Sequence, residues 1–231
     1  ANLNNDRGIH ICKSMLAYQK WGKGKTPKNS KVKPDHFVGD FYVMFENKLK
    51  ENPELEKEIH DILQKWEDGD KKVRKLWKLM NSWVLSGMKE TYNLFESKFD
   101  FWTYESEIYD KVKGILDEGI RKNLFFKNEE GNLVAKLEPE LPNKVVLRAD
   151  GTSIYITQDM ILARMRFEKY KIDKMIYVVA SEQNLHFKQL FKILQLLGYN
   201  WYKDYHHLSY GLVNLPSGRM KTREGNVVDA D

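Results

Sequence analysis

KMIYVVA (174–180) and NLHFKQLFKILQLLG (184–198) are the two segments that decide the fold class. The first is a continuous apolar, β-branched run, which is typical of a strand buried on both faces of a parallel sheet. The second is amphipathic at helical spacing and ends at a glycine, a common helix stop. Three further elements flank this pair: a strand in KVVLRADGT (144–152), a helix over 159–170 and a strand in HHLSYGLVNL (206–215). Together the five segments have the order strand–helix–strand–helix–strand. That order predicts an α/β fold with a parallel sheet and crossover helices.

Composition excludes several classes of protein. The chain has 231 residues, 42% of them hydrophobic, and 38 Lys+Arg against 33 Asp+Glu leave a net charge of +5. No apolar run approaches the roughly 18–20 residues that a membrane-spanning helix needs, so neither a span nor a membrane partner is expected. The single cysteine, Cys12, excludes a disulfide framework and a CxxC site. The mild basic excess permits an RNA partner without requiring one.

The first hundred residues predict helices over 9–21, 36–49, 53–66 and 71–96, each with apolar residues three and four apart. The lysine-rich segment 22–35 has no such periodicity and is predicted to be a loop. The sequence then predicts a strand in 98–106, a helix over 107–122 and a hairpin in 124–138 with its turn at 129–131.

Polar side chains gather where the predicted parallel strands end, and ligands of such sheets bind at that edge. Tyr155 and Asp159 follow the first strand, Gln183 and His186 follow the second, and a basic loop at 218–225 follows the third. Together they suit an anionic ligand such as a nucleotide. Each also has a plain structural interpretation: a helix-start pair, a hydrogen-bonded histidine and a solvated turn. No HExxH motif or clustered carboxylate accompanies the six histidines, so no metal site is expected.

Taken in order, several motifs resemble one family. DGTSIYITQD (150–159), MIYVVASEQNLHFKQLFKILQLLGY (175–199) and HHLSYGLVNLPSGRMKTREG (206–225) are similar to the second half of the arginyl-tRNA synthetase catalytic domain. The opening NLNNDRGIHICKSMLAYQKWG (2–22) resembles the stretch just past that family's first nucleotide motif. The archaeal and eukaryotic cytoplasmic branch looks nearest.

The resemblance implies a class I aminoacyl-tRNA synthetase with a Rossmann-like parallel sheet and an inserted helical region. Such an enzyme joins L-arginine to ATP as arginyl-adenylate, releases pyrophosphate, and passes arginine to the 3′ end of tRNA(Arg) in the cytoplasm. ATP is a substrate, accompanied by Mg²⁺, and no metal bound by the protein itself is expected.

The resemblance also assigns roles to residues. Tyr155, Asp159 and Gln183 match the family's arginine-binding positions. His186, Gly211, Arg219, Met220 and Lys221 match its ATP-binding positions. The loop cations Arg219, Lys221 and Arg223 match the KMSKS motif and are expected to stabilise charge on the phosphates. The loop departs from that motif by carrying Arg219 in place of its first lysine and Thr222 in place of its second.

Four regions are expected: a first-half Rossmann remnant (1–24), the helical insertion (25–97), a strand, helix and hairpin insertion (98–144), and the second Rossmann half with the KMSKS-like loop (145–231). The family's HIGH motif is absent from this sequence, so we expect an incomplete fragment that does not aminoacylate alone. The alternative is a non-catalytic RNA-binding or assembly module, derived from the same fold, that uses the basic loop and the lysine-rich segment.

Overall fold

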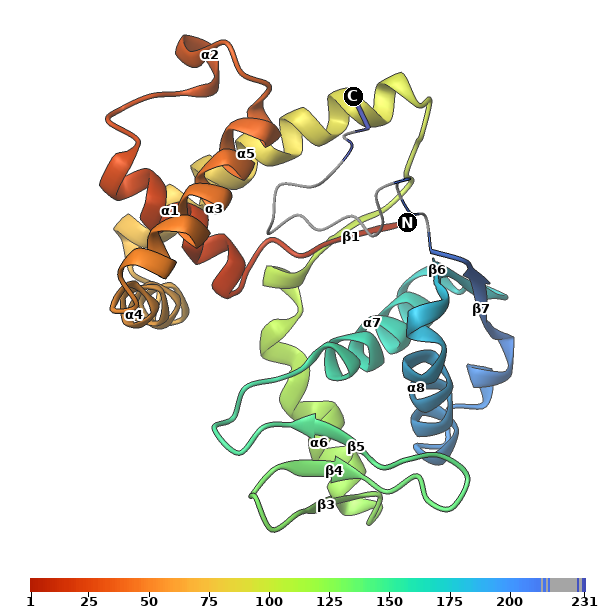
Figure 1. Cartoon of the computed structure of the whole chain (residues 1–231). Helices are drawn as coiled ribbons and strands as arrows, with labels where there is room; N and C mark the ends of the chain where they lie inside the picture. The colour runs from red at the N-terminus through yellow and green to blue at the C-terminus, as the bar shows by residue number, and fades with distance from the viewer. Residues whose placement is uncertain (213, 215, 217–227, 229) are drawn as a thin grey trace. The chain divides into compact units, whose positions relative to one another are not determined.

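The computed structural model describes residues 1–212, 214, 216, 228, 230 and 231 (Figure 1). The chain forms two compact units. Unit 1 comprises Ala1–Ser106 and Leu215–Asp231, and unit 2 comprises Glu107–Asn214.

Unit 1 is mainly helical, and its helices follow the predicted ones closely. They are α1 (Ile9–Trp21), α2 (Pro27–Ser30), α3 (Pro34–Glu51), α4 (Leu55–Glu67) and α5 (Lys71–Leu94). The α5 boundary has a local cause, because the Asp70 side chain accepts hydrogen bonds from the backbone N–H groups of Lys72 (2.9 Å) and Val73 (2.8 Å). The short α2 lies in the lysine-rich segment that the sequence predicted to be a loop. Pro53 precedes α4 in a turn and does not open the helix itself.

The core of unit 1 lies where α1 packs against α3, α4 and α5 (Figure 1). Met15, Phe45, Ile59 and Met80 are each at most 1% exposed there. Burying a side chain of this size stabilises the fold by about 1.5–3 kcal/mol relative to leaving it exposed. The helical periodicity of the sequence therefore marks a real buried face.

Two short parallel strands, β1 (Asn2–Asn4) and β2 (Trp102–Tyr104), pair with each other and so join the two ends of the segment Ala1–Ser106 of unit 1. Asp6, just after β1, secures this junction. Its carboxylate accepts hydrogen bonds from the backbone N–H of Ser106 (2.9 Å) and from the Ser106 hydroxyl (2.7 Å). Its backbone carbonyl accepts from the side chains of Trp77 (2.5 Å) and Asn81 (3.2 Å) on α5.

Unit 2 carries two separate sheets and three main helices. β3 (Phe125–Lys127), β4 (Leu133–Ala135) and β5 (Lys144–Leu147) form an antiparallel sheet, and β6 (Met175–Ala180) and β7 (Tyr205–Tyr210) form a parallel pair. The helices are α6 (Val112–Arg121), α7 (Tyr155–Tyr170) and α8 (Asn184–Leu196), with single turns η3 (Ser181–Gln183) and η4 (Asn200–Asp204) beside α8. The unit β6–α8–β7 is the parallel crossover that the sequence predicts.

The strand in 144–152 was predicted to join the parallel sheet, and this prediction was wrong. β5 pairs with β4, in the register Ala135 with Lys144 and Leu133 with Leu147, and takes no place beside β6. The link between β4 and β5 is short and is closed by Asn143, whose side-chain oxygen accepts from the Leu137 N–H (2.7 Å). A link of this kind favours an antiparallel partner, because a parallel partner needs a crossover of a dozen or more residues.

β6 is also less buried than its apolar run predicts. Ile176 and Val178 are 57% and 62% exposed, whereas Tyr177 between them packs against Phe187 and Phe191 of α8. Alternate residues of a strand point to opposite faces, so α8 covers one face of β6 and leaves the other open in the described part of the chain. Among the described residues, no helix is long and apolar enough to cross a membrane.

Two glycines on α6 permit a stability test of the packing in unit 2. A Cβ atom on buried Gly119 would lie 2.2 Å from ring atoms of Phe125, whereas a Cβ atom on Gly114 would meet nothing within 4 Å. We expect Gly119→Ala to lower the free energy of unfolding by about 1–3 kcal/mol because the Phe125 ring must move. Gly114→Ala, the matched control, should raise it by up to about 1 kcal/mol through helix propensity. Urea unfolding of both variants measures this, and equal stability of the two would contradict the packing described.

Candidate functional site

The helix α7 positions Tyr155 and Asp159 one turn apart. It begins directly at Tyr155, after Ile154 in an extended conformation, so Asp159 lies in its second turn and caps nothing. The Thr157 hydroxyl donates a hydrogen bond to the Val146 carbonyl on β5 and fixes the start of the helix to the sheet. Tyr155 is 69% exposed, so its ring is open to a ligand.

The turn η3 and the first turn of α8 position Gln183 and His186 directly after β6. Phe187 and Leu190 on the same helix are buried, and Gln189 donates a hydrogen bond to the Pro142 carbonyl (2.9 Å). These contacts orient α8 so that its first turn faces the start of α7.

A hollow of about 340 Å³ lies between these elements within unit 2. Three of the predicted site residues, Tyr155, Gln183 and His186, line it together. Glu182, which follows the same strand as Gln183, also lines the hollow. The sequence analysis missed the other residues in its wall, which come from β5, the start of α7 and α8: Lys144, Ile154, Ile156, Leu185 and Gln189. Nothing in the sequence around Lys144 predicted a place in this site, because only the tertiary structure brings the start of β5 to the hollow.

Asp159 and His186 form the closest polar contact of the site. The His186 Nε2 atom lies 2.6 Å from the Asp159 Oδ2 atom, and the two side chains are 15% and 22% exposed. Asp159 does not itself line the hollow, but it is bonded to the histidine that does. The structure thus brings together all four predicted residues of α7, η3 and α8.

The phenol of Tyr177 lies close to this pair. Burial raises the pKa of Tyr177, and the neighbouring Tyr205 and Asp159 raise it further. Tyr177 therefore stays neutral at physiological pH.

The remaining predicted residues are less informative. Gly211 follows β7 and is not among the residues that line the hollow. Arg219, Met220, Lys221 and Arg223, which the sequence analysis assigned to ATP and its phosphates, lie outside the described residues.

Residues 14–231 match the family model described as tRNA synthetases class I (R), catalytic domain. The chain belongs to this family. Arginine--tRNA ligase of Parabacteroides distasonis is 50% identical over 248 residues, and that of Treponema denticola is 51% identical over 233 residues. Both alignments cover 100% of this chain but only 42% and 40% of the relatives, so the chain spans about two fifths of their length.

Solved structures agree on the fold. The chain superposes on Thermus thermophilus arginyl-tRNA synthetase with a TM-score of 0.76 at 23% identity, covering 98% of this chain and 43% of that one. For the Plasmodium falciparum arginyl-tRNA synthetase the TM-score is 0.70 at 15% identity, covering 91% of this chain and 35% of that one. The predicted α/β class of a class I synthetase catalytic domain is therefore confirmed. The sequence relatives named here are bacterial, and they give no support to the expected nearness to the archaeal and eukaryotic branch.

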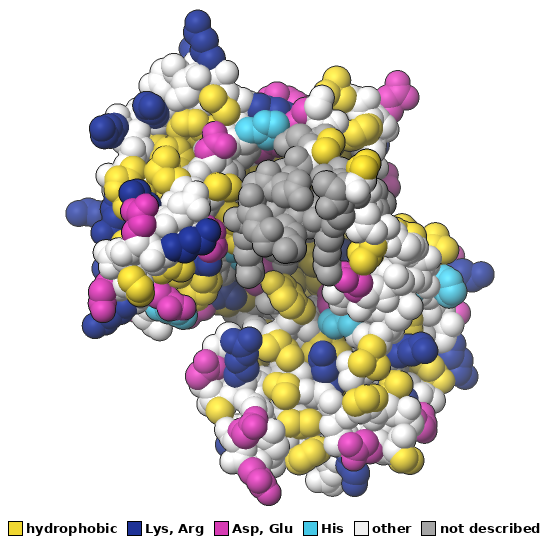
Figure 2. Space-filling view, viewed as in Figure 1, with side chains coloured by type: hydrophobic (Ala, Val, Ile, Leu, Met, Phe, Trp, Pro, Cys, Tyr) yellow, Lys and Arg dark blue, Asp and Glu magenta, His cyan; other side chains and the backbone are white. Residues whose placement is uncertain are grey.

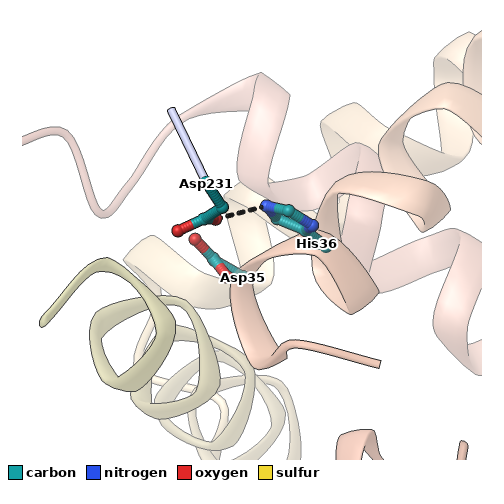
Figure 3. A group of neighbouring side chains, drawn as sticks. All are labelled: Asp35, His36 and Asp231. Atoms are coloured by element: carbon teal, nitrogen blue, oxygen red, sulfur yellow. Dashed lines mark ion pairs between the residues drawn. The ribbon is translucent and has the colours of Figure 1, made fainter. Parts of the chain in front are cut away.

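A second polar group, in unit 1, contains three side chains of metal-binding type: Asp35, His36 and Asp231 (Figure 3). Their oxygen and nitrogen atoms face one another, but the Lys33 ammonium group lies among them, 3.1 Å from the Asp35 carboxylate and bonded to Asp231. The Lys33 bond lowers the pKa of Asp231, and the bonds to Asp231 and Asp35 outweigh burial and raise the pKa of Lys33. The Lys33 ammonium group thus occupies the place between these carboxylates that a metal ion would take, and it offsets part of their negative charge. Sequence spacing gave no sign of it, because Asp231 is far from the other members along the chain.

The single cysteine of the chain is buried on α1 and is not part of the site. Burial raises the pKa of Cys12 to about 12, against a smaller opposing effect of the Arg7 charge. A thiol rather than a thiolate is present at neutral pH, and the thiolate is the reactive form.

We therefore expect Cys12 to resist a thiol reagent such as DTNB at pH 8 in the native chain and to react rapidly in urea. Since the folded pKa lies above the unfolded value of 9.0, its contribution to stability is complete below pH 9 and is lost as the pH rises toward 12. Absorbance of the released thionitrobenzoate follows the reaction. Equal rates with and without urea would contradict the burial of Cys12.

Proposed function

We propose that this chain is part of the catalytic core of an arginine–tRNA ligase. The reaction is activation of L-arginine by ATP and transfer of arginine to the 3′ end of tRNA(Arg). In the first step a carboxylate oxygen of arginine bonds to the α-phosphorus of ATP, and the bond to the β-phosphate breaks to release pyrophosphate. Family membership and relatives whose names state this activity support the proposal. It places the protein in translation and hence in the cytoplasm.

The observation that carries the proposal is a carboxylate, Asp159, one helical turn from the open ring of Tyr155 and bonded to the wall of the hollow. A guanidinium group is best gripped by a carboxylate through two charge-assisted hydrogen bonds. In this proposal Asp159 binds the guanidinium group and Tyr155 packs beside it. Gln183 holds the amino-acid end of the substrate.

The proposed ATP contacts come from His186, Gly211 and the loop residues Arg219, Met220 and Lys221. Arg219, Lys221 and Arg223 supply positive charge as pyrophosphate leaves, and Mg²⁺ accompanies the phosphates of ATP. Such catalysis rests on positioning and electrostatic stabilisation and requires no covalent nucleophile. The four-region organisation predicted from the sequence, with boundaries at 24/25, 97/98 and 144/145, belongs to the same proposal, as does kinship with the archaeal and eukaryotic branch.

Replacing Asp159 tests the arginine pocket. Asp159→Asn keeps the shape of the side chain but removes its charge, so we expect the affinity for L-arginine to fall by at least about tenfold, the cost of losing a charge-assisted pair. Isothermal titration with L-arginine, with L-lysine and citrulline as comparison ligands, measures this. Asp173→Asn, an exposed acid of the same unit, is the matched control and should bind like the wild type. Unchanged arginine binding by Asp159→Asn would refute the assigned role.

A specific observation also favours a surface for RNA on unit 1, and this is the surface that the alternative function, a non-catalytic RNA-binding module, would use. A hollow of about 360 Å³ at α2 is lined by Lys28, Lys31 and Trp83, together with neighbouring residues of the 26–34 segment. Lys23 and Lys25 are exposed nearby, and none of the four lysines pairs with a carboxylate in the part of the chain that the structure describes. Figure 2 shows the dark-blue side chains around the α2 end of unit 1.

The segment holds these lysines in a defined backbone conformation. Thr26 and Asn29 cap α2 reciprocally, with the Asn29 side chain accepting from the Thr26 N–H at 2.7 Å, and Lys31 has a positive φ of 54°. Lysine cations can bind the phosphates of an RNA backbone, and an aromatic ring beside them can stack on a base.

Charge reversal tests this surface. We expect Lys28→Glu with Lys31→Glu to weaken tRNA binding and to reduce the slope of log affinity against log salt by about one per lysine. The double variant Lys57→Glu, Lys65→Glu changes the net charge equally on exposed positions of α4 and is the control. Fluorescence anisotropy of labelled tRNA at several salt concentrations gives the slopes. Equal slopes in the two double variants would refute the surface.

The two functions are separable by the same variants. A ligase core loses arginine binding with Asp159→Asn and keeps RNA binding. A non-catalytic RNA-binding module has no use for a guanidinium pocket and shows no arginine-selective heat in the wild type.

A further inference from the structure

The carboxylate of Asp159 has a single hydrogen-bond partner among the described residues, and that partner is His186. A carboxylate only accepts hydrogen bonds, so the Nε2 atom of His186 must carry the proton. This leaves Oδ1 of Asp159 without a partner in the described part of the chain. With 22% of the side chain exposed, that oxygen can still receive a ligand.

His186 is itself held in place from the other side. Its ring meets Phe187 edge-on, with 5.4 Å between centroids, and Phe187 packs against His207 at 4.3 Å. The His207 Nε2 atom lies 2.8 Å from the Val179 carbonyl of β6. A chain of contacts therefore runs from the parallel strands through the first turn of α8 to the Asp159 carboxylate.

The backbone of Asp159 is fixed, and among the described residues His186 is the hydrogen-bond partner that fixes its carboxylate. Met160 and Ile161, its neighbours on α7, are fully buried and immobilise the helix. The terminal torsion of an aspartate is broad, however, and the carboxylate rotates freely unless a partner holds it. A guanidinium group needs both oxygens in a defined plane.

We propose that His186 is a positioning residue for arginine recognition, because its Nε2–H group holds Oδ2 of Asp159 and presents Oδ1 to the guanidinium group. This inference rests on the proposed arginine pocket and gives His186 a role on the arginine side in addition to the adenosine contact. Lys144 and Glu182 also line the hollow, but neither bonds to Asp159 in the described structure. The orientation of the carboxylate is thus assigned to one hydrogen bond.

Two substitutions separate the hydrogen bond from the shape of the ring. His186→Phe keeps an aromatic ring and removes the donor, whereas His186→Gln supplies an amide donor in its place. His206→Phe, at an exposed position on β7, is the matched control. The full chain of each variant is titrated with L-arginine and with citrulline, and thermal unfolding is measured in parallel.

We expect His186→Phe to weaken arginine binding about three- to tenfold. Without the hydrogen bond, the Asp159 side chain must lose its rotational freedom when arginine binds, and this entropy cost lowers the affinity. Selectivity for arginine over citrulline should fall as well, because the misaligned carboxylate distinguishes the two ligands less well. His186→Gln should restore both, and His206→Phe should change neither. A merely structural role would lower the melting temperature and leave the selectivity unchanged.

The outcomes are distinguishable. If the wild type binds arginine selectively and His186→Phe does so equally well, the positioning role is overturned and the proposed function stands. If the wild type binds no arginine, the proposed pocket fails, and the hydrogen bond is then tested alone by the ¹⁵N shifts of the His186 ring. The Nε2–H group should give a hydrogen-bonded resonance in the wild type, and Asp159→Ala, which removes the acceptor, should shift it. Identical ring resonances in the wild type and in Asp159→Ala would overturn the assigned bond.

Discussion

Burial of one side of α7 is the constraint on which the candidate site depends. Ile156, Met160, Ile161 and Ala163 are at most 1% exposed, and burying such side chains contributes about 1.5–3 kcal/mol for each of the large ones. The Thr157 hydroxyl adds a bond to β5. Because this side of the helix cannot rotate away from the core, the other side must present Tyr155 and Asp159 at a set place. A carboxylate on a rigid helix is more precisely held than one on a loop.

The same logic extends to α8. Phe187, Leu190, Ile193 and Leu194 are buried, so the first turn of α8 is as firmly placed as the start of α7. His186 on α8 and Gln183 on the adjoining turn η3 therefore reach the hollow from one side, and Tyr155 reaches it from α7. Their polar groups converge because the apolar faces of α7 and α8 are both buried in the core of unit 2. Unit 1 is held differently, by aromatic packing among Tyr18, Phe37, Phe41 and Trp83 and by the hydrogen bonds of Asp6.

Much of the site was predictable, and the limits of the prediction have physical causes. Tyr155, Gln183 and His186 were expected at one edge of a sheet, and the structure places all three in the wall of one hollow. The expected sheet was nevertheless wrong in part, since β5 joins the antiparallel β3–β4 hairpin. The polar residues still meet because α7, not β5, carries Tyr155. The direct bond between Asp159 and His186 was not expected, as spacing along the chain does not reveal a contact between two helices.

The sequence by itself determined the features that depend on a few neighbouring residues. The N-cap at Asp70, the turn at Gly131 with its φ of 82°, and the end of α8 before Gly198 with its φ of 87° are all local in origin. Family membership is readable in the same way, because its motifs are continuous stretches. Only the tertiary structure decided which strand β5 joins, which face of β6 is covered and which group holds the Asp159 carboxylate. Each of these depends on the packing of segments distant in the chain, whose pairing follows from the shape and burial of whole elements.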